Sequence, residues 1–255
     1  MKEYSCKHKA KEFIFKLEGA RVNYPEQGQV YLAYPKELKH HEKVSVIIAI
    51  HGSGRNALSY KYVDFYKYQR DIALCKGYVF ASISNDKDSW GLDDGLFNVN
   101  LLCNYLKENH NAKEKFALWG TSAGGVLMNR MVKEYPNKVN FLIGTFPVYD
   151  LLIEFNVLNM CRSAWGTEDK EEFMKLIQGK NPADFPYALT NHTYYISHGL
   201  YDAAVPAQQN SIRMRDEVNA HGGNINLDLV TGGHSTSNYN VYDSILTKLP
   251  LADKI

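Results

Sequence analysis

A serine between two glycines lies where a strand-like segment meets a helix-like segment, and this junction constrains the fold most strongly. Residues 115–119 form an apolar run that predicts a buried strand, and residues 126–132 have the spacing of an amphipathic helix. Gly120, Ser122 and Gly124 lie between them in a G-x-S-x-G pattern. Side chains at either glycine would collide with the neighbouring element. The pattern therefore predicts a tight turn that lifts the Ser122 hydroxyl clear of a sheet, as in a nucleophile elbow.

The same pattern also arises by chance in Gly-rich turns, where the serine would only cap a helix. The rest of the chain decides between these interpretations. Strand-like and helix-like segments alternate along it, which is typical of a doubly wound α/β fold with a mostly parallel sheet. We expect strands at 12–17, 29–34, 44–50, 78–82, 115–119, 139–146, 192–198 and 225–230, and helices at 60–76, 96–108, 123–135, 207–221 and 236–249.

The first two predicted strands are separated by a Pro-Glu-Gln-Gly turn and should form an antiparallel hairpin at the edge of the sheet. Residues 147–190 interrupt the alternation with short helical patches and polar turns. Because this segment is too short to form a hydrophobic core of its own, we interpret it as a small inserted cap. The predicted organisation is one α/β domain over residues 1–255 that carries this cap.

The composition argues against several classes of partner. The 255 residues are 45% hydrophobic and carry 29 basic and 28 acidic side chains, for a net charge of +1. This balance gives no electrostatic reason to expect nucleic acid or an anionic membrane as a partner. No apolar run is long enough to span a bilayer, and the N-terminus lacks the apolar core of a signal peptide.

The four cysteines, Cys6, Cys75, Cys103 and Cys161, are scattered and show no zinc-type spacing. We expect Cys75 and Cys103, which fall in predicted helices, to be reduced core residues. A cytoplasmic location is therefore expected, and the oligomeric state is left open.

Three of the predicted strands end in residues that could work together chemically. Ser122, Asp202 and His234 each follow a strand, and ligand sites in open parallel sheets lie at the carboxyl ends of strands. Their order along the chain is the one used by α/β-hydrolase catalytic triads. Two other carboxylates compete with Asp202: Asp184 falls in the predicted cap, and Asp228 lies inside a strand.

Four motifs in sequence make the chain resemble the α/β-hydrolase family over nearly its whole length. They are H-G-x-G at 51–54, G-x-S-x-G-G at 120–125, H-G-x-x-D-x-x-V-P at 198–206 and G-G-H at 232–234. Within that family the chain resembles the esterase branch of feruloyl esterases and polyhydroxybutyrate depolymerases. It is also similar to the prolyl-oligopeptidase-type hydrolases. Many of the esterases are secreted and bear disulfides, which is not expected for this chain.

The resemblance implies a role for each of these residues. Ser122 would be the nucleophile, His234 the general base and Asp202 the group that orients the imidazole. The backbone N–H groups of Ala123 and Ser53 would form the oxyanion hole. We expect His51 and His198 to brace their loops. No metal and no organic cofactor is implied.

The aromatic side chains of Trp90, Tyr149, Trp165 and Tyr201 could line a substrate pocket, since each falls in a loop after a strand or in the cap. The alternative is that they only pack the cap onto the sheet. The leading functional hypothesis is a serine hydrolase that cleaves a small-molecule carboxylic ester. A serine peptidase and a ligand receptor without catalysis are the alternatives.

Overall fold

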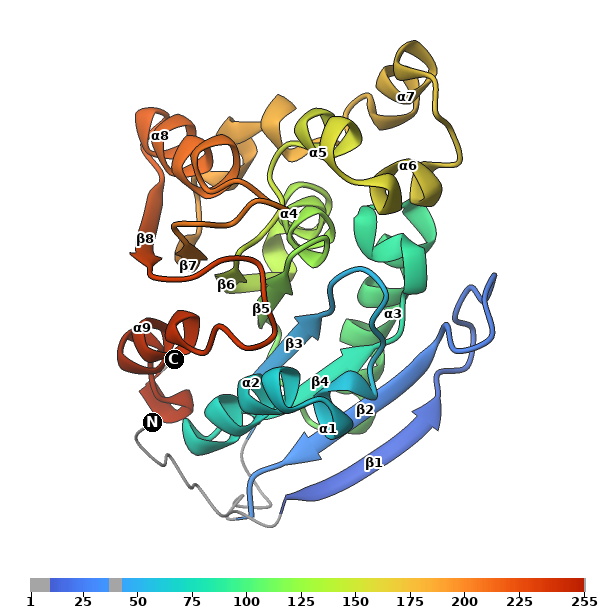
Figure 1. The fold of residues 1–255 in the computed structure, drawn as a ribbon. Coiled ribbons are helices and arrows are strands. Elements are labelled where there is room, and N and C mark those ends of the chain that lie inside the picture. Colours follow the sequence, from blue (N-terminus) through green and yellow to red (C-terminus); the bar gives the residue numbers. More distant parts are fainter. Residues whose placement is uncertain (1–9, 37–42, 255) are drawn as a thin grey trace.

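The computed structural model describes residues 10–36 and 43–254, and they form an eight-stranded sheet with helices on both faces (Figure 1). The order across the sheet is β1-β2-β4-β3-β5-β6-β7-β8. The strands are β1 (Lys11–Lys16), β2 (Gln29–Tyr34), β3 (Val46–Ile50), β4 (Val79–Ile83), β5 (Phe116–Thr121), β6 (Val139–Thr145), β7 (Thr193–Gly199) and β8 (Asn224–Val230). The α/β-hydrolase fold predicted from the sequence is confirmed.

The edge formed by β1 and β2 is antiparallel, and the remainder of the sheet is parallel. Lys11 in β1 lies opposite Tyr34 in β2, and β2 pairs antiparallel with β4. Every pairing from β4 through β8 is parallel. The predicted hairpin at the sheet edge is thus confirmed, and the parallel strands bring their carboxyl ends to one side.

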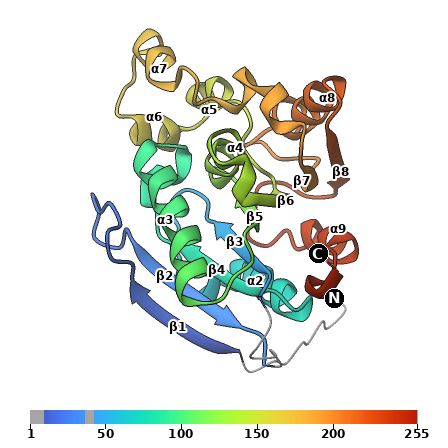
Figure 2. The same cartoon turned by 180° about the vertical axis from the view of Figure 1, so that it is seen from behind.

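Helices cover the two faces, as the opposite views in Figures 1 and 2 show. They are α1 (Ser59–Tyr62), α2 (Asp64–Cys75), α3 (Asp93–Asn109), α4 (Gly124–Glu134), α5 (Leu151–Val157), α6 (Asn159–Trp165), α7 (Lys170–Ile177), α8 (Arg213–Ala220) and α9 (Asn240–Lys248). In β3, Ile48 joins the apolar cluster under α3, α4 and α8, whereas Ile47 joins the cluster under α2 and α9. This alternation buries both faces of the strand, which explains its continuous apolar run.

Four predicted helices differ from the structure. The segment predicted as a helix at 207–221 starts with a π-helical turn at Gln208–Ile212 and is α-helical only from Arg213, and the helix predicted at 236–249 begins at Asn240. The segment predicted as one helix at 60–76 is broken at Val63, whose extended backbone (φ −104°, ψ 116°) separates α1 from α2. The helix predicted at 96–108 begins earlier, at Asp93. Leu92 is its N-terminal capping position, and Asp93 and Asp94 in its first turn form ion pairs with Arg130 and Arg21.

The inserted segment at 147–190 carries α5, α6 and α7. Its apolar side chains do not form a separate core. Phe155 and Phe173 pack in a cluster that also contains Trp90 and Val126, a residue of α4. Ala123, which directly follows Ser122, belongs to the same cluster, so the segment packs against the turn that carries Ser122.

The cysteines only partly match the expectation. Cys103 and Cys161 are free and buried, but Cys75 is disulfide-bonded, so the prediction that it is reduced is wrong. Cys6 lies outside the described residues. Since disulfides are typical of oxidising compartments, the cysteines no longer support a cytoplasmic location. Within residues 10–36 and 43–254, no helix has the length and apolar character needed to cross a membrane.

Candidate active site

The turn between β5 and α4 places Ser122 in a strained, positive-φ conformation (φ 53°). Glycine is required beside it because of close backbone approaches. A Cβ atom at Gly124 would lie 2.2 Å from the carbonyl oxygen of Ile50, and one at Gly120 would lie 2.9 Å from that of Gly124. The structure therefore has the sharp strand-turn-helix that the G-x-S-x-G pattern predicts.

Asp202 follows β7 and holds His234, which follows β8. The Asp202 Oδ2 atom is 2.8 Å from His234 Nδ1, although 32 residues separate the two in sequence. Asp202 Oδ1 accepts the backbone N–H groups of Ala204 (3.0 Å) and Val205 (2.7 Å). These bonds fix the carboxylate, and the carboxylate in turn fixes the orientation of the imidazole.

Asp202 is ionised in this environment. Burial by itself raises the pKa of its carboxyl, but hydrogen bonds from His198 and His234 outweigh burial, and the pKa falls to about 2. His198 Nε2 is 3.2 Å from Asp202 Oδ2 and 2.8 Å from the Val205 carbonyl oxygen. The buried His198 also contacts Ser211 Oγ through Nδ1 (2.7 Å), which confirms its predicted bracing role.

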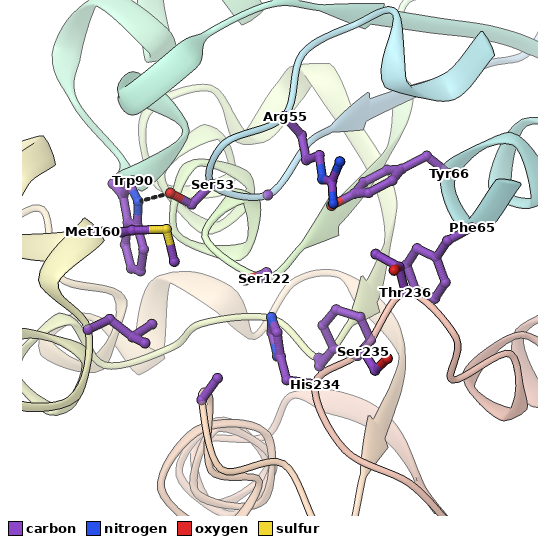
Figure 3. A pocket seen from close by; sticks show the side chains of 14 residues that line it. Ser53, Arg55, Phe65, Tyr66, Trp90, Ser122, Met160, His234, Ser235 and Thr236 are labelled. Carbon is purple, nitrogen blue, oxygen red and sulfur yellow. Dashed lines mark hydrogen bonds between the residues drawn. The ribbon is translucent and has the colours of Figure 1, made fainter. Parts of the chain in front are cut away.

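Ser122 and His234 line one pocket of about 330 Å³. In Figure 3, a nitrogen of the His234 ring points toward Ser122. The apolar part of the lining comes from Phe65, Phe146, Trp90, Leu158 and Met160. The Phe146 ring packs against the His234 ring in a tilted arrangement, with centroids 4.4 Å apart.

The loop after β3 forms the opposite wall of the pocket. A Cβ atom at Gly52 would lie 3.2 Å from Ser122 Cβ, so the loop backbone passes close to the serine. His51 Nε2 accepts the Asn85 N–H (3.0 Å), and His51 Nδ1 lies 2.9 Å from the Gly52 carbonyl oxygen. Burial lowers the pKa of His51 to about 4 despite the Gly52 carbonyl, so the ring is neutral. The predicted bracing role of His51 is thereby confirmed.

The two residues predicted to form the oxyanion hole lie at this wall and at the elbow. Ser53 lines the pocket, and its Oγ accepts a hydrogen bond from Trp90 Nε1 at 3.0 Å (Figure 3). Ala123 is the N-terminal capping residue of α4 and is fully buried. Backbone N–H groups in the first turn of a helix have no intrahelical acceptor, so the Ala123 N–H is suited to bind an oxyanion.

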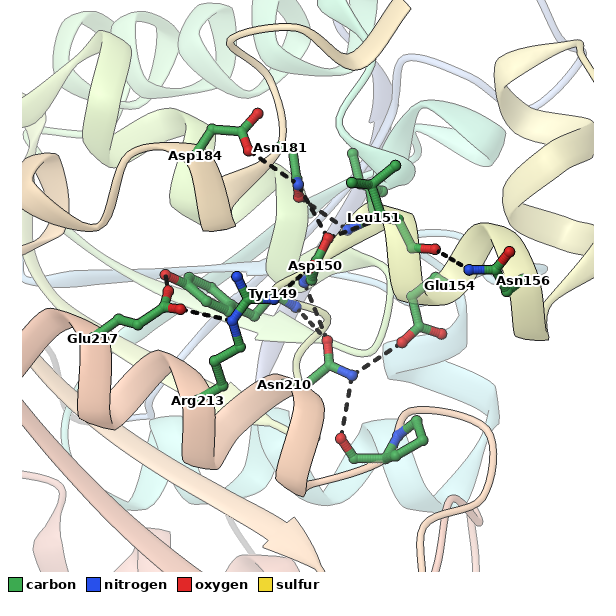
Figure 4. A network of polar contacts seen from close by, with 12 residues as sticks. Tyr149, Asp150, Leu151, Glu154, Asn156, Asn181, Asp184, Asn210, Arg213 and Glu217 are labelled. Atoms are coloured by element: carbon green, nitrogen blue, oxygen red, sulfur yellow. Dashed lines mark hydrogen bonds and ion pairs between the residues drawn. The ribbon is translucent and has the colours of Figure 1, made fainter. Parts of the chain in front are cut away.

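Trp90 lies in the pocket, but the other three predicted pocket aromatics do not line it. Tyr149 is buried in a polar network beneath α5 and α8, where its hydroxyl donates to Glu217 Oε2 (2.6 Å; Figure 4). Trp165 packs inside the apolar cluster of the inserted segment. Tyr201 is 73% exposed, since its side chain points away from the packed interior. These three residues therefore have structural or surface positions.

The competing carboxylates have other partners. Asp228 binds Ser244 and Lys248, and Asp184 accepts from Asn181 at 3.5 Å. In the parts of the chain that the structure describes, no group of three His, Cys, Asp or Glu side chains could hold a metal ion. Sequence reasoning missed Arg55 and Tyr66, which also line the pocket. Arg55 directly follows the H-G-x-G motif, and this position was the available signal.

Comparison with solved structures agrees with the α/β-hydrolase fold. The chain is similar to an acylaminoacyl peptidase solved with Z-Gly-Gly-Phe-chloromethyl ketone (TM-score 0.73, 17% identity), covering 94% of this chain and 40% of that one. A puromycin-hydrolyzing peptidase of Mycobacterium tuberculosis gives a TM-score of 0.74 at 15% identity, with coverages of 93% and 38%. A Pyrococcus furiosus esterase gives 0.67 at 11% identity, with coverages of 95% and 88%.

This chain thus spans about 40% of the length of the acylaminoacyl peptidase. Among curated proteins, no match to the sequence is found. The profile of the prolyl oligopeptidase family matches residues 77–247, a stretch that includes Ser122, Asp202 and His234. Since that match spans well over half of the chain, the chain belongs to the prolyl oligopeptidase family of serine hydrolases.

Proposed function

We propose that this serine hydrolase cleaves carboxylic esters through an acyl-enzyme, with Ser122, His234 and Asp202 as its catalytic triad. One observation carries the proposal. The elbow serine and an imidazole held at 2.8 Å by an ionised aspartate face the same pocket. A nucleophile, a base and an orienting carboxylate are the groups that acyl transfer needs.

In the proposed reaction, Ser122 Oγ attacks the ester carbonyl carbon while His234 Nε2 accepts the hydroxyl proton. The tetrahedral oxyanion receives hydrogen bonds from the backbone N–H groups of Ala123 and Ser53. When the carbon–oxygen bond breaks, His234 returns the proton to the departing alkoxide. A water molecule then attacks the acyl-enzyme by the same route, and the carboxylic acid product leaves.

The ester assignment is supported by the side chains of the pocket. Peptidases that trim peptides from a free N-terminus need carboxylates to hold the amine. The described residues that line this pocket include no Asp or Glu. The similarity to the Pyrococcus furiosus esterase extends over 88% of that protein, whereas it covers about two fifths of the acylaminoacyl peptidase.

The test is hydrolysis of p-nitrophenyl butyrate by the wild type and by Ser122→Ala, beside hydrolysis of a dipeptide p-nitroanilide. We expect ester turnover in the wild type, its loss in Ser122→Ala, and much weaker cleavage of the anilide. Ser163→Ala is the matched control, because it removes an exposed serine hydroxyl from α6.

Two results would contradict the proposal. A strong preference for the anilide would favour the peptidase, which is supported by the similarity to an acylaminoacyl peptidase and a puromycin-hydrolyzing peptidase. Tight ligand binding without turnover of either substrate would favour the receptor.

A further inference from the structure

Arg55 differs from every other arginine of this protein in its ionic partners. The sequence has seven arginines, and six of them lie 2.5–3.1 Å from a carboxylate oxygen. In residues 10–36 and 43–254, no carboxylate oxygen lies within 4.0 Å of the Arg55 guanidinium. Arg55 is also the one permanently charged side chain among the described residues that line the pocket.

The guanidinium is held at the pocket by its neighbours. Arg55 N–H donates to the Gly52 carbonyl oxygen (3.3 Å), which closes the turn that passes Ser122. The guanidinium carbon lies 5.8 Å from the centre of the buried Tyr66 ring. Figure 3 shows the head group of Arg55 beside the Tyr66 hydroxyl, at the wall that faces His234 and Thr236.

Tyr66 remains a neutral hydrogen-bonding group beside this cation. Burial raises the pKa of its phenol to about 12, although the Arg55 charge and the Gly52 backbone oppose the rise. A half-buried cation next to a neutral phenol has lost part of its hydration without gaining an opposite charge. Such a guanidinium favours a carboxylate, which it can bind through two parallel hydrogen bonds.

The loop after β3, which carries Gly52 and Arg55, determines how far from Ser122 such a carboxylate would bind. A Cβ atom at Gly52 would be 3.1 Å from the Tyr66 hydroxyl and 3.2 Å from Ser122 Cβ. The wall that carries Arg55 is therefore next to the reacting serine, so one small substrate can reach both the Arg55 guanidinium and Ser122.

We infer that Arg55 binds a carboxylate of the substrate, so that the preferred substrates are esters bearing a carboxylate a few bonds from the scissile carbonyl. The inference rests on the proposed function, since it takes Ser122 as the reacting group. It adds the substrate class, because an aromatic-lined pocket with one unpaired cation selects an amphipathic, monoanionic ester over a neutral one.

The test uses two matched pairs of esters. In the first pair, 3-acetoxybenzoate is compared with 3-acetoxybenzamide, so the charge is on the leaving group. In the second, a p-nitrophenyl monoester of adipic acid is compared with its methyl diester, so the charge is on the acyl group. We expect the wild type to prefer the acidic member of at least one pair. In Arg55→Gln, the ratio of kcat/KM between acidic and neutral members should fall about 10- to 100-fold in that pair.

Arg215→Gln is the matched control, because it removes the same charge from an exposed, already paired arginine on α8 and should leave the ratio unchanged. Arg55→Lys keeps the charge but not the two-pronged geometry, and should lie between wild type and Arg55→Gln. An unchanged ratio in both pairs would overturn the inference. An equal loss for acidic and neutral members would overturn it too, since Arg55 would then act on the oxyanion or the loop.

Binding to catalytically silent protein separates this inference from the proposed function. Calorimetric titration of Ser122→Ala with 3-acetoxybenzoate and mono-p-nitrophenyl adipate, and with their neutral counterparts, needs no turnover. Tighter binding of an acid that disappears in the Ser122→Ala/Arg55→Gln double variant supports the carboxylate site even if the wild type hydrolyses no ester. Equal binding of acidic and neutral members would overturn the carboxylate site even if ester hydrolysis is strong.

Discussion

Asp202 has two separable tasks, and two substitutions at this position should separate them. Its Oδ2 atom receives the His234 Nδ1 hydrogen bond, whereas its Oδ1 atom accepts two backbone N–H groups of the loop after β7. Asp202→Asn can keep an oxygen toward the backbone while presenting an NH2 group to His234. The imidazole must then accept at Nδ1 and carry its proton on Nε2, which is the wrong tautomer for a base.

The magnitudes follow from these contacts. With the wrong tautomer, kcat should fall about 10⁴-fold, while the fold keeps its loop bonds. Asp202→Ala should show the same catalytic loss and in addition leave the Ala204 and Val205 N–H groups unpaired, at about 1–3 kcal/mol each. The wild-type carboxylate has a pKa of about 2, below the ordinary value near 3.8. It therefore contributes roughly 2 kcal/mol of stability above pH 5, lost as the pH falls through 2.

The assay is p-nitrophenyl butyrate hydrolysis together with urea unfolding of wild type, Asp202→Asn and Asp202→Ala at pH 7. The account predicts equal catalytic losses but a larger loss of stability for the alanine variant. If Asp202→Asn retained ester turnover within tenfold of wild type, Asp202 would not be the residue that orients the base, and the reasoning would be refuted.

Three further predictions concern stability. Gly124→Ala should destabilise the fold by about 3 kcal/mol or more, measured by urea unfolding, because its Cβ would lie 2.2 Å from the Ile50 carbonyl oxygen. Burial and nearby carboxylates raise the pKa of Glu154 to about 8. The folded protein therefore holds a proton that the unfolded chain has lost, and the free energy of unfolding of the wild type should fall as the pH rises from 4.5 to 8. Glu154→Gln should remove that slope, and equal slopes would contradict the burial. Tyr149→Phe removes the hydroxyl bond to Glu217 and should cost about 1 kcal/mol in thermal unfolding. Its ester turnover should stay within about twofold of the wild-type value, and a large loss would indicate that Tyr149 takes part in substrate binding after all.

The positions of the three triad residues were predictable because the same pattern, a polar residue after a strand-like run, occurs three times along the chain. Ser122, Asp202 and His234 each follow a run of strand-like residues, and parallel strands must bring those ends together. The Asp202–His234 contact, with its partners 32 residues apart, follows from that topology and not from local sequence. Periodicity and order along the chain were therefore enough to predict the fold and to nominate the site.

The direction of a loop side chain was not predictable in the same way. Trp90 and Tyr149 both follow strands and are both fully buried, yet Trp90 bonds to Ser53 in the pocket and Tyr149 to Glu217 in a polar network. Residue type and position cannot distinguish these outcomes, because they depend on which partner the folded chain brings near. Arg55 was missed for a related reason, since only the folded structure shows that no carboxylate lies beside it.

The cysteines show a further limit. Cys75 is the last residue of the amphipathic helix α2. That position is equally compatible with a buried thiol and with a disulfide. Helical spacing does not indicate whether a cysteine at this position is a thiol or part of a disulfide. The break at Val63 was also hidden, since the residues on both sides keep helical periodicity.

The central claim is that Ser122 is a nucleophile activated by His234, and covalent labelling tests it most directly. Purified wild type, Ser122→Ala and His234→Ala would be treated with a fluorophosphonate, digested and analysed by mass spectrometry. The account predicts one phosphonylated site in the wild type, at Ser122, with no label in Ser122→Ala and a strongly slowed reaction in His234→Ala. Labelling at another residue, or labelling of Ser122 that does not depend on His234, would contradict it.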